Sequence, residues 1–191
     1  MFKFFAFLGR MKFIKRWSLM RSVREENIME HSQEVAVIAH ALALINNKIF
    51  NGNIDEKKAV LYAQYHEVGE VITGDLPTPI KYFNPEIKTA YKSLEQKACE
   101  RILDMLPDNL KEEYKKYVLP DVNSEEYKLV KAADRLSAYL KCVEEIKAGN
   151  SEFKKAKSSI LGELKSLKRA DVDYYLKAFA PAYELTLDEL D

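Results

Sequence analysis

Apolar side chains recur along this chain three and four residues apart, which is the spacing of an α-helix face. The first such helix begins after Asn27, a residue type that favours the N-cap position, and its apolar stripe reaches Ile45. A second helix is predicted from Asp55 to about Gly74. One face of this second helix would carry Ala59, Ala63, His66 and Glu70.

The same periodicity continues to the end of the chain. Further helices are predicted at 85–106, 124–149, 151–168 and 171–180, with a weaker charged stretch before Pro120. Asparagine and glycine runs at 46–47 and 51–53 predict a break between the first two helices. No segment alternates apolar and polar residues over a convincing length. The pattern therefore predicts an all-α fold, with residues 1–191 in one domain.

The segment Asp75-Leu76-Pro77-Thr78-Pro79 interrupts this helical pattern. Two prolines remove backbone donors and push the residues before them towards extended geometry, so the segment is expected to form a rigid loop. A stiff loop positions Asp75 and Thr78 for a ligand at little entropic cost. The alternative is a plain turn that ends the helix before it.

Composition narrows the class of protein. Lys+Arg and Asp+Glu number 30 each, and a net charge of +0 argues against a nucleic-acid polymer as a partner bound by bulk electrostatics. The N-terminal apolar run stops at Gly9, shorter than a signal-peptide core, and no stretch approaches a membrane span of about 20 apolar residues. The two cysteines, Cys99 and Cys142, form no CxxC pair and are expected to be reduced thiols. We therefore expect a cytoplasmic protein without a membrane partner.

The first acidic residue is Glu25, so the chain begins with a locally positive segment. Its basic residues form a solvated face, an anion-binding wall or a membrane-surface helix. Within this segment, Arg16 carries a planar guanidinium that suits phosphate binding, and the next residue, Trp17, carries a large aromatic ring. Trp17 is the sole tryptophan, and its alternative role is in the core.

The histidines and their acidic neighbours suggest a metal site. His31, His66, Glu67 and Asp134 come from three predicted helices, and two imidazoles with two carboxylates suit a first-row divalent cation. The alternative is that the histidines are satisfied core residues. Glu70 is a candidate proton carrier, or otherwise a solvent-facing helix carboxylate.

Taken in order, these segments resemble the HD-domain metal-dependent phosphohydrolases, and specifically the bacterial 5′-deoxynucleotidases. The matching stretches are 14–21, Glu30-His31-Ser32, Tyr65-His66-Glu67, 74–79 with Lys81-Tyr82-Phe83, Ala133-Asp134, 138–142 and 187–189. The likeness covers nearly the whole chain. It implies a compact HD-domain helical bundle, a homodimer, and hydrolysis of deoxynucleoside 5′-monophosphates to deoxynucleoside and phosphate.

The resemblance also assigns residues. It implies that His31, His66, Glu67 and Asp134 hold one divalent cation, often cobalt or manganese in vitro, while Glu70 and Arg16 act in catalysis. The implied substrate-binding residues are Arg16, Trp17, His31, Glu67, Asp75, Leu76, Pro77, Thr78 and Asp134. In this assignment Arg16 orients the phosphate, and Trp17 lies against the sugar and disfavours a 2′-hydroxyl. His40 is expected to be structural.

One position departs from the family signature, which has aspartate directly after the second histidine where this chain has Glu67. Glutamate keeps the charge but adds one methylene, about 1.5 Å. A misplacement of about 1 Å costs on the order of a hundredfold in rate. One alternative is therefore a catalytically impaired nucleotide- or metal-binding relative. Two others are another HD phosphohydrolase acting on an alarmone or a nucleoside triphosphate, and an all-α interaction module without chemistry.

Overall fold

The structure, a computed structural model, describes residues 1–81 and 83–191. Its α-helices are α1 (Phe4–Leu8), α2 (Ile28–Ile49), α3 (Glu56–Tyr65), α4 (Glu70–Thr73), α5 (Thr78–Lys81), α6 (Pro85–Leu103), α7 (Asp108–Val118), α8 (Glu125–Lys147), α9 (Lys154–Ser166) and α10 (Ala170–Ala178). Short 3₁₀ turns lie at Met11–Phe13, Ser151–Phe153, Ala180–Glu184 and Leu187–Glu189. Within these residues the only extended pairing is one antiparallel bridge between Lys15 and Asn27, so the all-α prediction is confirmed.

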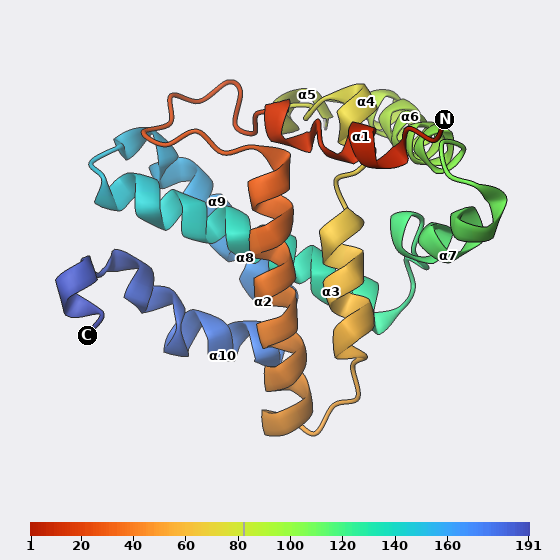
Figure 1. Ribbon diagram of the computed structural model, residues 1–191. Coiled ribbons are helices and arrows are strands. Elements are labelled where there is room, and N and C mark those ends of the chain that lie inside the picture. Colours follow the sequence, from red (N-terminus) through yellow and green to blue (C-terminus); the bar gives the residue numbers. More distant parts are fainter. Residues whose placement is uncertain (82) are drawn as a thin grey trace.

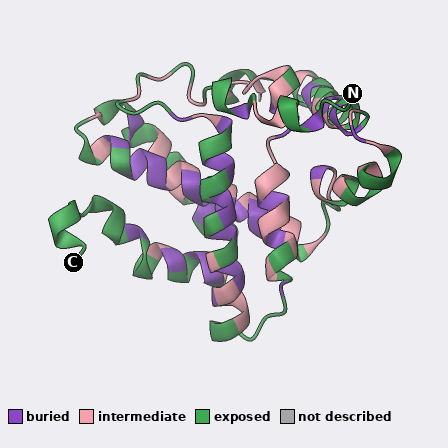
Figure 2. Cartoon of the chain, in the orientation of Figure 1, coloured by how far each residue is buried: buried purple, intermediate pink, exposed green. Residues whose placement is uncertain are grey.

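Helices α2, α3 and α8 pack against one another and form the centre of the fold (Figure 1). Buried residues line the faces where these helices meet, and exposed ones cover their outer faces (Figure 2). Leu42 of α2 and Leu136 of α8 are fully buried, and burying each side chain stabilises the fold by about 1.5–3 kcal/mol. Small residues let the helix axes approach closely at this contact. They are Ala39, Ala43, Ala59, Ala63, Ala132 and Ala133.

A second buried cluster joins α1, α6 and α7 to the start of α2 and to Val68. Phe4 is the anchor of α1, and its ring meets that of Tyr114 edge-on at a centroid distance of 4.9 Å. Tyr82, part of one stretch that carries the family resemblance, lies outside the described residues. No helix in the described chain is long and apolar enough to cross a bilayer.

The prediction of one helix from 55 to 74 is wrong. Helix α3 ends at Tyr65, residues 66–69 form turns, and α4 begins at Glu70. The carbonyl of Ala63, which a continuing helix would offer to the amide of Glu67, accepts a hydrogen bond from His66 Nδ1 at 2.6 Å. The turn then closes through bonds of three-residue spacing, such as Glu70 N to Glu67 O at 3.0 Å. His66 and Glu70 therefore do not share a helix face.

The expected break at 46–47 is also wrong, because α2 continues to Ile49. The Asn47 amide is satisfied within the fold, where it donates to Ile54 O at 2.8 Å and its oxygen accepts from Ile54 N at 2.7 Å. Asn46 donates to Asp171 at 2.9 Å. These tertiary bonds outweigh the preference of asparagine for loops.

The rigid segment at 75–79 is only partly a loop, because Thr78 and Pro79 open α5. Proline is tolerated in the first turn of a helix, where its missing N–H needs no partner. Helix α6 ends at Leu103 rather than near 106, and the weaker charged stretch forms α7. The long helix expected after Ser124 is confirmed as α8, and its N-cap is the Ser124 side chain, which accepts from Tyr127 N.

Candidate metal centre

Four side chains that are far apart in sequence converge where α2, α3 and α8 meet. His31 comes from the first turn of α2, His66 and Glu67 from the turn after α3, and Asp134 from the middle of α8. One potential ligand atom from each residue lies within 4.8 Å of the others. The prediction that these four residues come together is confirmed.

His31 is completely buried and held on both ring nitrogens. Its Nε2 lies 3.1 Å from Asp134 Oδ1, and its Nδ1 lies 3.2 Å from both Ser137 Oγ and Glu26 Oε1. Burial and Arg16 oppose protonation of this ring, but Asp134 and Glu26 outweigh them and raise the pKa of His31. Acceptors behind a histidine fix its ring and select the nitrogen that faces a metal.

His66 presents one unsatisfied nitrogen to the same point. Its Nδ1 donates to Ala63 O, so Nε2 carries the lone pair and faces the cluster. This Nε2 is buried and makes no hydrogen bond, although it lies 3.2 Å from Glu67 Oε1. A bound cation satisfies such an atom. Two imidazoles and two carboxylates are a donor set for a first-row divalent metal, so the residues present fit the ion.

The carboxylates of the cluster are held ionised by their surroundings. Burial opposes ionisation of Glu67, but His66 and the neighbouring Glu70 outweigh it and lower its pKa. The pKa of Asp134 lies well below its usual value, since Lys131 and His31 offset the cost of burial. Lys131 Nζ lies 3.1 Å from Asp134 Oδ2. Both groups therefore present negative charge to a cation.

Glu70 lies beside this cluster and is buried, with 6% of its surface exposed, so the alternative of a solvent-facing carboxylate is wrong. Burial first, and then the charge of Glu67, raise the pKa of Glu70 to about 11. Its Oε2 is buried without a hydrogen-bond partner in the described chain. A protonated carboxyl group thus adjoins the ionised Glu67.

The longer side chain of Glu67 reaches the cluster. Its carboxylate is one of the four groups within 4.8 Å of one another. Glu67 lies in a turn rather than on a helix face, so its backbone is not constrained by the helical register of α3. The extra methylene does not remove the carboxylate from the site.

Arg16 approaches the same cluster from the loop before α2. The bridge between Lys15 and Asn27 aligns this loop, and Arg16 N donates to Glu26 O at 2.9 Å. Burial by itself would lower the pKa of Arg16, but Glu26, Glu67, Asp134 and Asp75 raise it. Its Nε lies 3.2 Å from Glu26 Oε1 and makes no hydrogen bond. Arg16 alone among the basic residues of the N-terminal segment is not exposed, and its role in binding an anion stays a prediction.

Trp17 has a backbone conformation that is rare for a bulky residue, with φ at 57°. Such a conformation costs on the order of 1–3 kcal/mol and persists only where the surroundings hold it. The indole Nε1 donates to Glu26 Oε2 at 3.0 Å, and the ring lies 5.4 Å from that of Phe153. Trp17 is therefore fixed on the loop beside Arg16 and remains partly exposed.

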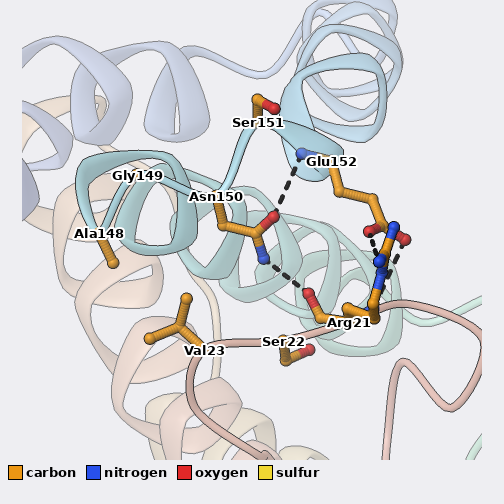
Figure 3. A pocket seen from close by; sticks show the side chains of 8 residues that line it. All are labelled: Arg21, Ser22, Val23, Ala148, Gly149, Asn150, Ser151 and Glu152. Carbon is orange, nitrogen blue, oxygen red and sulfur yellow. Dashed lines mark hydrogen bonds and ion pairs between the residues drawn. The ribbon is translucent and has the colours of Figure 1, made fainter.

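The outer side of this loop is tied to the end of α8. Glu145 accepts from Val23 N at 2.8 Å and from Arg24 N at 3.2 Å. Figure 3 shows Asn150 reaching Arg21 O, with Arg21 beside Glu152 around a surface hollow. Residues 148–152 and 21–23 line this hollow, which contains none of the four candidate ligands.

The segment 75–78 lies close enough to the cluster for the charge of Glu67 to act on Asp75. Asp75 is half-buried, and burial raises its pKa while the Arg16 charge opposes that rise. Leu76 and Pro77 are half-buried and Thr78 is exposed. No hydrogen bond or ion pair joins these four residues to the candidate ligands in the part of the chain described. Their substrate-binding assignment stays a prediction.

Three residues of the site were not found from the sequence. Ser137 and Lys131 each lie three positions from Asp134 on α8, so helical spacing alone would have placed them beside it. Glu26 lies in an irregular loop and gives no periodic signal. His40 is not part of the cluster, as expected, but it is exposed, and its structural role stays a prediction.

Comparison with known proteins agrees with this geometry. Residues 3–183 match a family model described as 5′-deoxynucleotidase YfbR-like. A 5′-deoxynucleotidase from Vibrio vulnificus is 51% identical over 98% of this chain and 97% of its own length. Another from Yersinia pseudotuberculosis is 50% identical over 98% of this chain and 95% of its own length.

Solved structures share the fold. An HD-domain phosphohydrolase from Listeria innocua superposes with a TM-score of 0.82 at 22% identity, over 95% of this chain and 88% of that one. A cyanophage S-2L HD phosphohydrolase, solved with dA and one catalytic Zn²⁺ ion, superposes with a TM-score of 0.65 at 19% identity, over 95% of this chain and 96% of that one. The fold is therefore the predicted HD-domain helical bundle. The full-length matches show that the chain belongs to the YfbR-like 5′-deoxynucleotidase family.

Proposed function

We propose that this chain hydrolyses deoxynucleoside 5′-monophosphates to deoxynucleoside and phosphate at the site formed by His31, His66, Glu67 and Asp134. The observation that carries the proposal is the convergence of these four side chains to within 4.8 Å. Membership of the 5′-deoxynucleotidase family supports the reaction and the substrate class. The structure contributes a set of ligands that suits a divalent cation.

The chemistry divides between the cation and the side chains around it. When bound, the cation lowers the pKa of an adjacent water and offsets negative charge on a phosphoryl oxygen. Arg16 binds and orients the phosphate through its guanidinium, which lies close enough to Glu67 and Asp134 to interact with their charges. Glu70 is the proton carrier: its protonated carboxyl gives a proton to the departing 5′-oxygen, and the proton that the attacking water releases then restores it.

The sugar and base of the substrate are assigned to Trp17 and to residues 75–78. Trp17 lies against the sugar, where a large rigid ring leaves no room for a 2′-hydroxyl. Asp75, Leu76, Pro77 and Thr78 line the rest of the nucleotide pocket. The charge of Asp75 reaches Arg16, because each affects the pKa of the other.

The remaining assignments concern the ion, the assembly and the compartment. We propose cobalt or manganese as the cation that activates the enzyme in vitro, a homodimer as its assembly and the cytoplasm as its location. Metal titration and light scattering test the first two. The mixed nitrogen and oxygen ligands support a borderline metal over calcium or magnesium, which prefer oxygen.

Phosphate release from paired substrates tests the function. We expect dAMP to be hydrolysed with cobalt, AMP to be hydrolysed much more slowly, and neither to be hydrolysed after chelation. His66→Ala abolishes the reaction, whereas His40→Ala, an exposed histidine outside the cluster, retains it. Equal rates on the two sugars would overturn the role of Trp17. Phosphate release from nucleoside triphosphates or an alarmone alone would favour another HD activity, and metal binding without turnover would favour the impaired relative.

A further inference from the structure

One buried carboxylate joins the three functional parts of this site. Glu26 is 8% exposed and lies at the end of the loop that begins at Arg16. Its Oε2 accepts from Trp17 Nε1 at 3.0 Å. Its Oε1 lies 3.2 Å from both Arg16 Nε and His31 Nδ1. Glu26 therefore contacts the candidate phosphate-binding residue Arg16, the candidate sugar-binding residue Trp17 and the candidate metal ligand His31.

Each nitrogen that the two oxygens of Glu26 face can donate a hydrogen bond. With His31 Nε2 directed at the metal cluster, its Nδ1 carries the proton and points to Glu26 and Ser137. The indole and guanidinium nitrogens are donors only. An ionised carboxylate accepts the indole hydrogen bond through Oε2, while its Oε1 forms an ion pair with Arg16 and lies beside His31 Nδ1. A glutamine has one acceptor and one donor end, so it leaves one side facing a donor.

The position of Glu26 is set by the backbone rather than by these contacts. Arg16 N donates to Glu26 O at 2.9 Å, and Ile28 N donates to Ile14 O at 3.0 Å, which closes the loop at its base. This pairing brings the Glu26 carboxylate within hydrogen-bond distance of Trp17 and ion-pair distance of Arg16. The strained backbone of Trp17, with φ at 57°, is held by the bond from Met20 N to Trp17 O at 2.8 Å and by the contacts of the indole with Glu26 and Phe153.

We propose that Glu26 is a positioning residue that fixes Arg16 and Trp17 relative to His31 and thereby sets the preference for deoxyribose. The inference rests on the proposed function, in which Arg16 meets the phosphate and Trp17 the sugar. Glu26 touches neither the substrate nor the cation in this assignment. It acts through the three side chains that it holds.

Selectivity is the readout that separates positioning from a general structural role. We expect Glu26→Gln and Glu26→Ala, assayed at saturating cobalt, to reduce the ratio of kcat/KM for dAMP to that for AMP by tenfold or more. Misfolding or metal loss lowers both rates equally and leaves this ratio unchanged. Glu25→Gln is the matched control, because Glu25 is exposed and pairs only with exposed Lys15 in the described chain. It should keep the wild-type ratio.

Fluorescence tests the positioning without any turnover. Trp17 is the sole tryptophan, so the intrinsic emission reports on it alone. We expect Glu26→Ala to shift the emission to longer wavelength and to at least double quenching by acrylamide, while Glu25→Gln leaves both unchanged. Wild-type emission and a wild-type ratio in both Glu26 variants would overturn the inference. If the wild-type enzyme hydrolysed neither nucleotide, the proposed function would fail, and the emission would still decide whether Glu26 holds Trp17.

Discussion

His66 Nδ1 donates to the main-chain oxygen of Ala63 across 2.6 Å, within the last turn of α3. This single bond has two effects. It occupies the carbonyl at which the helix would continue, and it fixes the tautomer that leaves Nε2 free and facing the cluster. The end of α3 and the availability of a metal ligand thus have the same cause.

Metal binding should depend on these ligands individually. We expect His66→Ala and Asp134→Asn each to weaken binding of Mn²⁺ by more than a hundredfold, because each removes one of four ligands. Isothermal titration calorimetry on the chelator-treated protein measures this, with one ion per chain expected for the wild type. His40→Ala serves as the control, and it should bind as the wild type does. Unchanged affinity in either ligand variant would show that the four side chains do not hold the ion.

Shortening the side chain at 67 should not improve the enzyme. The carboxylate of Glu67 already lies within 4.8 Å of the other ligands, and aspartate would withdraw it by about 1.5 Å. We therefore expect Glu67→Asp to have a kcat/KM for dAMP equal to or below that of the wild type, and Glu67→Gln to lose metal affinity. A gain of tenfold or more in Glu67→Asp would show instead that the native chain is impaired at this position.

The sequence predicted the parts of this site that follow a helical repeat. His31 and Asp134 lie on long helices whose apolar stripes set which face turns inward, so their burial could be inferred. The turn at 66–69 could not, because it depends on a side-chain bond that competes with the backbone ladder. The role of Glu26 could not be predicted from the sequence for a related reason. Its role arises from contacts across an irregular loop, and no local periodicity encodes them.

Two glycines should respond in opposite directions to alanine. Gly74 ends α4 with φ at 73°, and Gly162 lies on the exposed face of α9. A Cβ at either position meets no atom within 4 Å, so backbone conformation decides the outcome. Gly74 has ψ at 164°, a backbone conformation essentially restricted to glycine, so we expect Gly74→Ala to destabilise the fold by about 1–3 kcal/mol. We expect Gly162→Ala to stabilise it by about 0.5–1 kcal/mol. Urea unfolding measures both changes. A destabilised Gly162→Ala protein would contradict this explanation.

The hydrogen bonds that Glu145 accepts from the loop at Val23 and Arg24 should make the free energy of unfolding depend on pH. Burial opposes ionisation of Glu145, but Lys141 at 2.6 Å, Asn150 at 2.8 Å and two backbone amides outweigh it and lower its pKa to about 2. Because the folded pKa lies below the unfolded value, the stabilisation is complete above about pH 5 and is lost as the pH falls towards 2. The shift corresponds to about 3 kcal/mol.

Glu145→Gln tests this link, because an amide resembles the protonated acid at every pH. Urea unfolding at pH 7, 5, 4 and 3 should show the variant less stable by about 3 kcal/mol at pH 7 and by nearly the same amount at pH 5, with the difference shrinking at pH 4 and again at pH 3. Glu152→Gln is the control, because Glu152 contacts the same loop through exposed Arg21, and this pair contributes at most about 1 kcal/mol. A difference between wild type and Glu145→Gln that stays constant across this range would mean that packing, rather than the charge of Glu145, holds the loop to α8.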